Sequence, residues 1–340
     1  MHKNIPSSLD RDYVIDFTKG FLVITMVAYH TLNYFLHGYH TAYAYLGYVT
    51  QAFIFYSGFM CGTVYFSKMQ IDRKAAYRRL FIRGIKLIFL FSILNVLIHA
   101  TISKNINGQD MSLQVIIDHI PLIFTIGYQS AVEFPILLPI GYTLLAAVPI
   151  MILNKLKYYL LIFLIIAFAL LTILDIMPYF NIRCLMTGIG GILSGLIYNE
   201  QKDNLSSSFF IYAGISFLLI FIVLIIPFAF DPRKYFVIYY FYINVIIYNL
   251  RTLGSYLNPS RILTKQIIKF GQYSLFLYLA QIFILQIIRG IFNFRIESIT
   301  IDHLIIFAAV NLFFIALCYL IDYLRWKILI IDKAYRSIFA

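Results

Sequence analysis

Residues 11–62 read RDYVIDFTKGFLVITMVAYHTLNYFLHGYHTAYAYLGYVTQAFIFYSGFMCG, which is two apolar runs separated by a short polar turn. A helix needs about 20 mainly apolar residues to cross the hydrocarbon core of a bilayer. Exposed backbone cannot cross lipid unless its hydrogen bonds are satisfied within the helix. The pattern therefore predicts two transmembrane helices, over residues 14–36 and 42–66.

Three polar residues lie within the first predicted helix: Asp16, Lys19 and His30. Asp or Lys at the middle of a membrane helix costs about 2.5–3.5 kcal/mol on insertion scales, so such residues usually face a protein interior or a water-filled path. Lys19 and His30 are eleven residues apart, which corresponds to about three turns and roughly 16 Å along the axis. They therefore share one face, with a cation near one membrane surface and an acid/base group deeper in the membrane.

A basic residue followed after ten residues by His30, together with the FIFYSGF sequence at 53–59, resembles the acyltransferase 3 family. The DFTKG sequence at 16–20 is similar to the same family, to its glucan-succinylating relatives and to the lysosomal glucosaminide acetyltransferase group. The resemblance extends to the basic YRRLFIR stretch at 77–83, and beyond it only hydropathy and helix number are similar. Lys19 stands where the family usually has Arg, which keeps the charge but loses the bidentate fork.

The resembling families are multi-spanning membrane enzymes that transfer acyl groups, often acetyl, to glycans and other acceptors. The resemblance implies an O-acyltransferase in which His30 is the general base, because an imidazole pKa near the working pH suits that role. It implies acyl-CoA, acetyl-CoA for example, as the donor substrate, and no permanently bound cofactor. The acceptor would be a hydroxyl of a glycan or glycolipid in the cell envelope, and the sequence does not distinguish acetyl from succinyl.

The composition indicates an integral membrane protein throughout, since 61% of residues are hydrophobic and only 12% are charged, against about 25% charged in soluble domains. We expect an all-α polytopic protein that forms a single transmembrane acyltransferase-like domain over residues 1–340, in the cell membrane of a bacterium. About ten spans are predicted, at 14–36, 42–66, 80–100, 132–153, 157–175, 182–198, 208–230, 235–251, 270–289 and 302–324.

The segment 111–128 is apolar but short, and counting it would give eleven spans. With ten spans, most Lys and Arg residues lie in cytoplasmic loops and both termini are cytoplasmic, as the positive-inside rule requires. The segment then belongs to an outer loop at 101–131. The net charge of +12 suits anionic lipid headgroups better than nucleic acid, because the charges are spread over short loops.

Arg78 and Arg79 belong to the basic loop 67–79 at the cytoplasmic side of the third predicted span, and Arg83 follows about one turn into the span. Such residues often determine topology, and they are equally suited to bind the phosphates of an acyl-CoA. Lys19 is a further candidate for the same anion.

Candidate substrate-binding residues are Asp16, Ser57, Gly58 and Glu133. Gly58 would let a backbone or a substrate approach closely. Glu133 lies where a span begins, so favourable interaction with the helix dipole competes with a catalytic role.

Gln281 occupies a position where the resembling families carry His, and an interhelical polar contact is its expected role. No cysteine has metal-ligand spacing, and no metal site is expected.

Two other function classes remain open. A transporter or flippase for a glycan or lipid-linked intermediate would also place polar residues along the first helix. An inactive relative that serves as a scaffold would explain why Lys19 and Gln281 depart from the family pattern.

Overall fold

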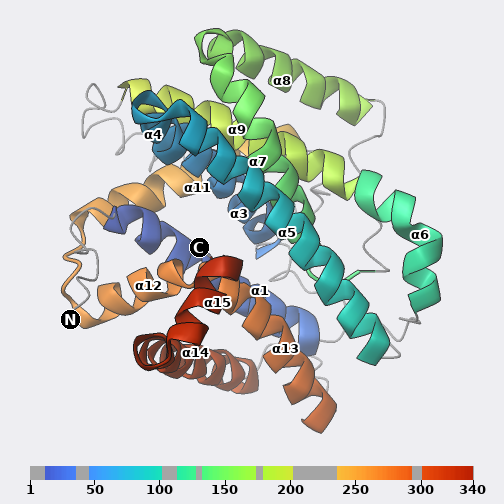
Figure 1. The fold of residues 1–340 in the computed structure, drawn as a ribbon, viewed down its shortest axis with the longest axis vertical. Coiled ribbons are helices and arrows are strands. Elements are labelled where there is room, and N and C mark those ends of the chain that lie inside the picture. Colours follow the sequence, from blue (N-terminus) through green and yellow to red (C-terminus); the bar gives the residue numbers. More distant parts are fainter. Residues whose placement is uncertain are drawn as a thin grey trace. The chain divides into compact units, whose positions relative to one another are not determined.

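The computed structural model describes residues 12–35, 46–101, 113–127, 132–173, 179–201, 236–292 and 301–339, and within them every regular element is a helix (Figure 1). The all-α class predicted from hydropathy is therefore confirmed for these residues. In chain order the elements are α1 (Tyr13–Phe35), α3 (Tyr48–Met60), the π-helix η2 (Cys61–Tyr65), α4 (Phe66–Ile71), α5 (Arg73–Thr101), α6 (Leu113–Thr125), α7 (Leu137–Ile152), the 3-10 helix η4 (Asn154–Leu156), α8 (Lys157–Ile173), α9 (Phe180–Gln201), α11 (Phe236–Tyr256), α12 (Ile262–Gln272), α13 (Ser274–Phe292), α14 (Ile301–Lys327) and α15 (Leu329–Phe339).

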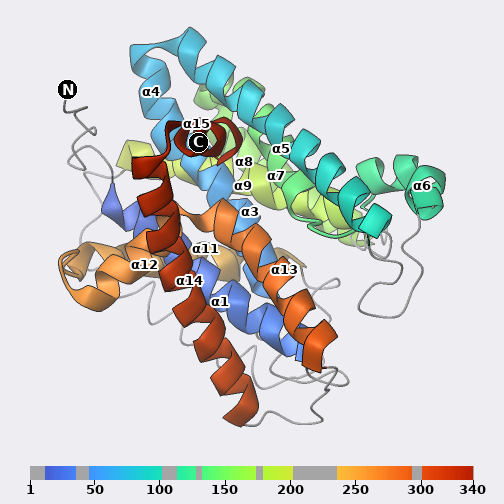
Figure 2. The same cartoon turned by 60° about the horizontal axis from the view of Figure 1, so that its bottom comes forward.

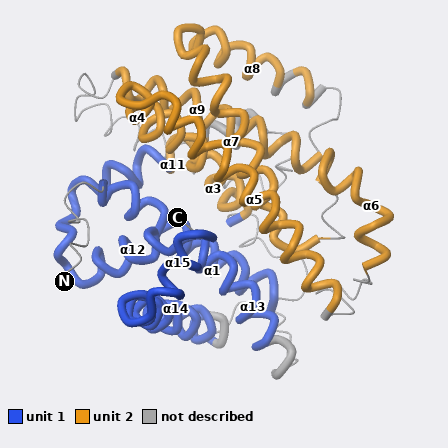
Figure 3. Tube along the Cα trace, viewed as in Figure 1, with its two compact units in different colours: residues 1–46, 247–340 blue, residues 47–246 orange. Residues whose placement is uncertain are grey.

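The chain divides into two compact units (Figure 3). Unit 1 comprises residues 1–46 and 247–340, and unit 2 comprises residues 47–246. Unit 1 contains α1 and the helices from α12 onward, whereas unit 2 contains the helices from α3 to α9. The expectation of one transmembrane domain over residues 1–340 stays a prediction, because one membrane domain can contain two packing units.

In unit 1, α1 and α12 approach so closely that both helices need glycine at the contact. A Cβ atom on Gly20 would lie 1.7 Å from the backbone oxygen of Ile267, and one on Gly271 would lie 1.7 Å from the backbone oxygen of Asp16. Small residues permit such backbone-to-backbone packing between membrane helices. α13 and α14 also pack against α1, and Figure 2 shows α1 and α13 side by side. α1 is therefore the central helix of unit 1.

In unit 2, α3 and α9 form the most extensive helix pair, and glycines again permit it. A Cβ atom on Gly58 would lie 2.1 Å from the backbone oxygen of Gly188, and one on Gly62 would lie 2.2 Å from that of Ile192. The π-helix η2 continues α3 and contains Gly62, so the contact with α9 extends into it. Single π-helical turns are frequent at functional sites.

Within the described residues, three helices are long and apolar enough to cross a membrane: Arg73–Ala100, Phe180–Glu200 and Leu304–Lys327. Two bent pairs raise the number to five if each pair is one span. One pair joins Leu137–Ile152 to Asn154–Ala167 at 88°, and the other joins Ile262–Gln272 to Ser274–Ile288 at 87°. The described chain therefore provides three to five candidate spans, fewer than the ten expected.

Particular features explain this difference. α1 coincides with the predicted span 14–36 but is not among the candidates, and its Asp16 and Lys19 lower its hydropathy. The predicted span 42–66 is divided among α3, η2 and α4, and the predicted span 208–230 lies outside the described residues. α6 has 13 residues and contains Pro121, so it is shorter than the roughly 20 residues that a span needs.

The crossing of α1 and α12 can be tested by adding single methyl groups. Gly20→Ala should lower the free energy of unfolding by about 1–3 kcal/mol, as overpacking typically does, because its Cβ would meet a backbone atom. Gly254→Ala is the matched control in unit 1, since the atoms nearest its Cβ would be side-chain atoms of Phe17 and Val14 and not backbone. Thermal unfolding of the detergent-solubilised protein measures both, and a Gly20→Ala variant as stable as the wild type would contradict the crossing.

Candidate functional site

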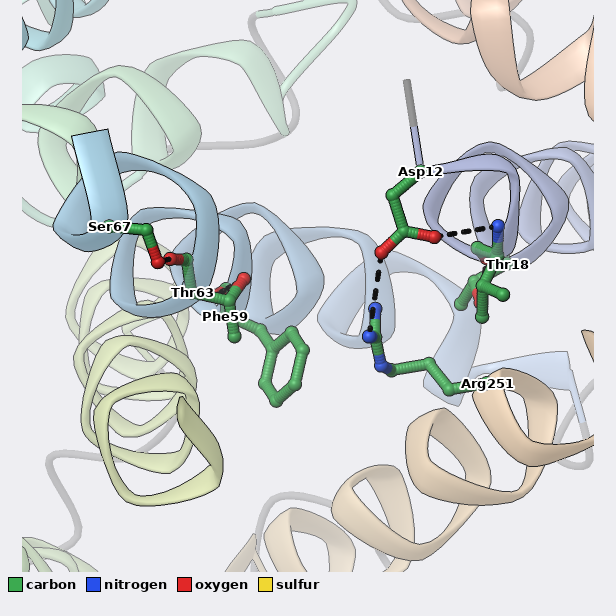
Figure 4. Close-up of polar contacts among 7 residues, drawn as sticks. Asp12, Thr18, Phe59, Thr63, Ser67 and Arg251 are labelled. Atoms are coloured by element: carbon green, nitrogen blue, oxygen red, sulfur yellow. Dashed lines mark hydrogen bonds and ion pairs between the residues drawn. The ribbon is translucent and has the colours of Figure 1, made fainter. Parts of the chain in front are cut away.

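The start of α1 carries an acidic residue that contacts both α1 and α11. One carboxylate oxygen of Asp12 accepts a hydrogen bond from the backbone N–H of Val14 at 2.9 Å. The other lies 3.9 Å from the Arg251 guanidinium, and Figure 4 shows the Arg251 side chain extending toward Asp12. Arg251 is buried, so this ion pair fixes a cation beside the N-terminal end of α1.

One turn further along α1, Asp16 and Lys19 form a second ion pair, with Nζ 3.9 Å from the Asp16 carboxylate. Asp16 is 1% exposed, whereas the Lys19 side chain is 23% exposed. Asp16 lies at the contact with Gly271 of α12, which holds its backbone in place. Lys19 is thus a partly accessible cation that already shares its charge with a buried carboxylate.

His30 lies toward the other end of α1, on the face predicted from its spacing to Lys19. The rings of Tyr29 and Tyr34 contact its imidazole edge-on, with centroids at 5.2 and 6.4 Å. Nδ1 of His30 is buried, and among the described residues nothing hydrogen-bonds to it. An imidazole nitrogen is therefore available inside unit 1 for a ligand or a proton.

Gln281 on α13 is a site residue whose importance the sequence interpretation underestimated. α13 packs against α1, and Gln281 is 0% exposed. Neither its Oε1 nor its Nε2 has a hydrogen-bond partner within the described chain, so the expected interhelical polar contact is not observed there. Each buried polar atom left unpaired destabilises a fold by about 1–3 kcal/mol, which makes this amide a second candidate ligand-binding group of unit 1.

Ser57 and Gly58 belong to unit 2, and the structure gives each of them a local role. The Ser57 hydroxyl donates to the backbone oxygen of Phe53 at 2.8 Å, and Gly58 permits the contact with α9. The next turns continue the same pattern, because Thr63 donates to the Phe59 carbonyl at 2.9 Å and Ser67 to that of Thr63 at 2.8 Å (Figure 4). Substrate binding by Ser57 and Gly58 stays a prediction, and a bulky residue at position 58 would test helix packing rather than binding.

The basic residues of the predicted donor site also lie in unit 2, on α5. Arg78 and Arg79 are exposed. Arg83 donates a hydrogen bond to the Tyr65 hydroxyl of η2, and the cationic groups of Arg83 and Lys68 each lie 5.8 Å from the centre of the Tyr65 ring. Tyr65 therefore contacts one cation of α4 and one of α5.

Glu133 lies just before α7 and outside the candidate spans. The Asn95 side chain of α5 hydrogen-bonds to both backbone polar groups of Glu133. Its amide oxygen accepts from the Glu133 N–H at 2.7 Å, and its amide nitrogen donates to the Glu133 carbonyl at 3.0 Å. Burial raises the pKa of the Glu133 carboxyl to about 7. Phe134, the next residue, has a φ of 55°, a backbone conformation that L-residues rarely adopt. A restrained carboxyl that titrates near neutrality fits a functional role better than a helix-dipole role alone.

A family model for the OpgC protein matches residues 11–185, which is more than half of the chain. The chain belongs to the OpgC family. Among curated proteins and among solved structures, no match was found. Membership of the OpgC family supports the acyltransferase-like part of the sequence resemblance and its glucan-succinylating relatives, but not acyltransferase 3 specifically.

The OpgC match includes α1 with Lys19 and His30, the Ser57–Gly58 motif, the basic stretch of α5 and Glu133. Gln281 lies beyond it. Of the predicted site residues, the structure places Asp16, Lys19 and His30 in unit 1 and all the others in unit 2.

The raised pKa of Glu133 predicts a pH dependence of stability in this OpgC-family protein. Its folded pKa of about 7 lies above the ordinary value of 4.5, so the folded state binds a proton that the unfolded chain releases. This contribution is fully present below about pH 4.5 and is lost as the pH rises through 7. The wild type should therefore lose free energy of unfolding between pH 5 and pH 8, and Glu133→Gln should reduce that loss by about 1–3 kcal/mol. The change in Tm between the two pH values measures it.

Glu200→Gln is the matched control for this measurement. Glu200 is exposed, accepts a hydrogen bond from Tyr158 at 3.0 Å and pairs with Lys157 at 3.0 Å, so its substitution removes a carboxylate that is not held by burial. Glu200→Gln should keep the wild-type change in Tm between pH 5 and pH 8, whereas Glu133→Gln should reduce it. An unchanged change in Tm in Glu133→Gln would show that Glu133 is ionised in the folded protein at pH 5.

Proposed function

We propose that this OpgC-family protein is an integral membrane acyltransferase that moves an acyl group from acyl-CoA to a hydroxyl of a glycan or glycolipid. OpgC is an osmoregulated periplasmic glucan succinyltransferase, which favours a glucan as the acceptor and succinyl over acetyl as the acyl group. The observation that carries the proposal is the imidazole nitrogen of His30, which lies buried and without a described partner on a helix inside the family match.

In the proposed reaction, His30 accepts the proton of the acceptor hydroxyl as the hydroxyl oxygen attacks the thioester carbonyl. A C–O bond forms to the acyl carbon, the C–S bond breaks, and the proton passes from the imidazolium to the departing thiolate of CoA. The products are the acylated glycan and free CoA, so no oxidant, reductant or metal ion is needed.

The donor is an anion, and the structure offers it two sets of cations. In unit 1, Lys19 is partly exposed and next to Asp16. In unit 2, Arg78, Arg79 and Arg83 lie along the start of α5, where Lys and Arg suit phosphate binding. Each set, taken by itself, is suited to the phosphates of acyl-CoA, and we assign Asp16, Ser57, Gly58 and Glu133 to substrate binding.

We further propose about ten spans in the bacterial cell membrane, with both termini cytoplasmic and the loop 101–131 outside. The charge distribution over the predicted loops supports this topology. Reporter fusions at Lys104 and after Ala340 should report the outer and the cytoplasmic side, respectively. A fusion after Ala340 that reports the outer side would show that the number of spans is odd.

The roles of Lys19 and His30 can be separated kinetically. Lys19→Ala should raise the KM for acyl-CoA because it removes a cation that binds the donor, and Lys19→Arg should retain most activity because the charge remains. His30→Ala should lower kcat about 10²–10⁴-fold, as loss of an acid/base group does, with little change in donor affinity. Initial rates of acyl-CoA-dependent glycan modification, with donor titration for each variant, measure both constants.

Membrane abundance and Tm of each variant serve as controls for these rates. Normal turnover by His30→Ala would overturn the assignment of the base. Transport of a glycan by the purified protein without acyl transfer would instead favour the transporter, which the polar residues of α1 also suit.

A further inference from the structure

The chain turns sharply where α14 ends and α15 begins. Figure 2 shows α14 along its length and α15 nearly end-on, whereas Figure 1 shows α14 foreshortened and α15 from the side. Leu304–Lys327 of α14 is long and apolar enough to cross a membrane, and only 17% of its most apolar stretch is buried. A helix set across the end of a span lies along the membrane surface. α15 is therefore oriented as an interfacial helix relative to the candidate span in α14.

Aromatic and basic residues at the end of α14 are those expected where lipid headgroups meet hydrocarbon. Tyr323 and Trp326 are exposed, and Trp326, the only tryptophan of the chain, is 78% exposed. Lys327 follows directly, and its ammonium lies 3.2 Å from the Tyr323 hydroxyl. Tryptophan and tyrosine are enriched at both membrane interfaces, and lysine extends its charge to the headgroups. The corner between α14 and α15 therefore has the composition of a membrane surface.

One side of α15 attaches the helix to the rest of unit 1. The Asp332 carboxylate accepts a hydrogen bond from Nε of Arg325 at 3.0 Å and pairs with Arg336 at 2.8 Å, which joins α14 to α15. The Tyr335 ring contacts that of Tyr273 edge-on, with centroids 5.7 Å apart. The Arg325 guanidinium lies 4.3 Å from the centre of the Tyr335 ring. These contacts fix the rotation of α15 about its own axis, and with it the direction of the other sides.

The remaining sides of α15 are exposed and form an apolar row and a basic row. Ile330, Ala334 and Ile338 follow one another at four-residue spacing, so they lie along one line of the helix. Ile330 is 77% and Ile338 is 46% exposed. Lys333 and Arg336 form the basic row, and both are exposed. Successive residues are about 100° apart around an α-helix, which places the basic row beside the apolar one.

The charge of this segment indicates what covers the exposed rows. Residues 325–339 include four basic residues and one acidic residue, and the acidic residue, Asp332, is already paired. Basic residues next to a span are attracted to anionic lipid headgroups. An apolar row beside them is stabilised where hydrocarbon removes it from water. Because α14 brings α15 to the bilayer, a lipid leaflet satisfies both rows at once.

We propose that α15 is an interfacial helix that binds anionic phospholipid headgroups. Its apolar row enters the boundary of the acyl chains, and Lys333 and Arg336 bind the headgroup phosphates. Asp332 and Tyr335 hold the helix in the rotation that this binding requires. The proposal needs α14 to cross the membrane, but it depends neither on acyl transfer nor on the number of spans in the chain.

Single tryptophans can measure how α15 lies on the bilayer. In a Trp326→Phe background, Ile338→Trp places the fluorophore on the apolar row. Leu329→Trp is the matched control, because position 329 is nine residues earlier and therefore on the opposite side of the helix. The full chain is reconstituted in liposomes of phosphatidylcholine and phosphatidylglycerol. Bromine on the acyl chains should quench Ile338→Trp strongly and Leu329→Trp weakly, and aqueous iodide should do the reverse.

Two results of this measurement would overturn the interfacial helix. Equal quenching of both variants by brominated chains would show that the apolar row does not face the hydrocarbon. Protection of Ile338→Trp from both quenchers would show that protein covers the row, either unit 2 or a second copy of the chain. The Tm of each variant confirms that the protein is folded.

The choice of headgroup is tested by placing bromine on one lipid at a time. In an equimolar mixture, brominated phosphatidylglycerol should quench Ile338→Trp more than brominated phosphatidylcholine does. The fraction of phosphatidylglycerol that gives half of the maximal quenching measures its apparent affinity. Adding Lys333→Gln should raise this fraction about fivefold, the effect of one basic residue at an anionic surface. Adding Lys333→Arg should leave it unchanged because the charge remains.

Lys265→Gln is the matched control for the charge. It removes the same charge from an exposed lysine of unit 1, on α12 and not on α15, and it should leave the half-quenching fraction unchanged. High salt should weaken the preference for phosphatidylglycerol, since ions screen exposed charges. An equal response to Lys333→Gln and Lys265→Gln, or equal quenching by the two brominated lipids, would overturn the binding of anionic headgroups by α15. No acyl donor or acceptor is present, so either result leaves the proposed function intact.

Discussion

At Gly20 and Gly271 the backbones of α1 and α12 touch, and no side chain fits between them. Asp16 contributes the carbonyl that Gly271 meets, so its carboxylate and the ammonium of Lys19 are held at the crossing. Because an α-helix is rigid over a few turns, the same contact sets the direction in which the face carrying His30 points. The polar groups of α1 are thus positioned by a backbone contact that involves none of their side chains. Unit 1 depends on Gly20 and Gly271 because neither residue has a side chain.

The buried polar residues fall into two classes once this framework is in place. Asn95 and Asn181 use their amides to hold backbone groups of Glu133 and Ile123, and they stabilise the fold. His30, Gln281 and His99 instead keep buried atoms without partners in the described chain. Each such atom is unfavourable unless water or a ligand satisfies it. Tyr77, Gln266 and Asn311 also keep one such atom within the described chain, so an unpaired atom selects candidates for ligand contact and does not by itself identify a substrate site. Burial alone does not distinguish the two classes, but hydrogen bonding does.

Hydropathy predicted the helices but not how they break or pair. The predicted spans 80–100, 182–198 and 302–324 lie within α5, α9 and α14, because long apolar runs have few alternatives in lipid. The 87° bend before α13 lies inside the predicted span 270–289, since hydropathy is the same on both sides of a bend. The bond between Asn95 and Glu133 joins residues 38 positions apart, and no local pattern specifies that partner. A dipole role for Glu133 was therefore as reasonable from the sequence as a catalytic one until Asn95 and the φ of Phe134 were seen.

Gln281 shows how one residue type limits the chemistry open to unit 1. An amide donates through N–H and accepts through its oxygen, but it does not titrate near neutrality, so it cannot receive the proton of an acceptor hydroxyl. His30 has an imidazole suited to that proton, whereas Asp16 is engaged with Lys19. An amide N–H can instead stabilise the negative charge that develops on a carbonyl oxygen during attack, a role that requires orientation and not proton transfer. With Gln where the resembling families carry His, the proposed reaction assigns proton transfer to His30 of α1 and would assign any stabilisation of charge to Gln281 of α13. In that proposed reaction His30 and Gln281 have complementary and not redundant roles.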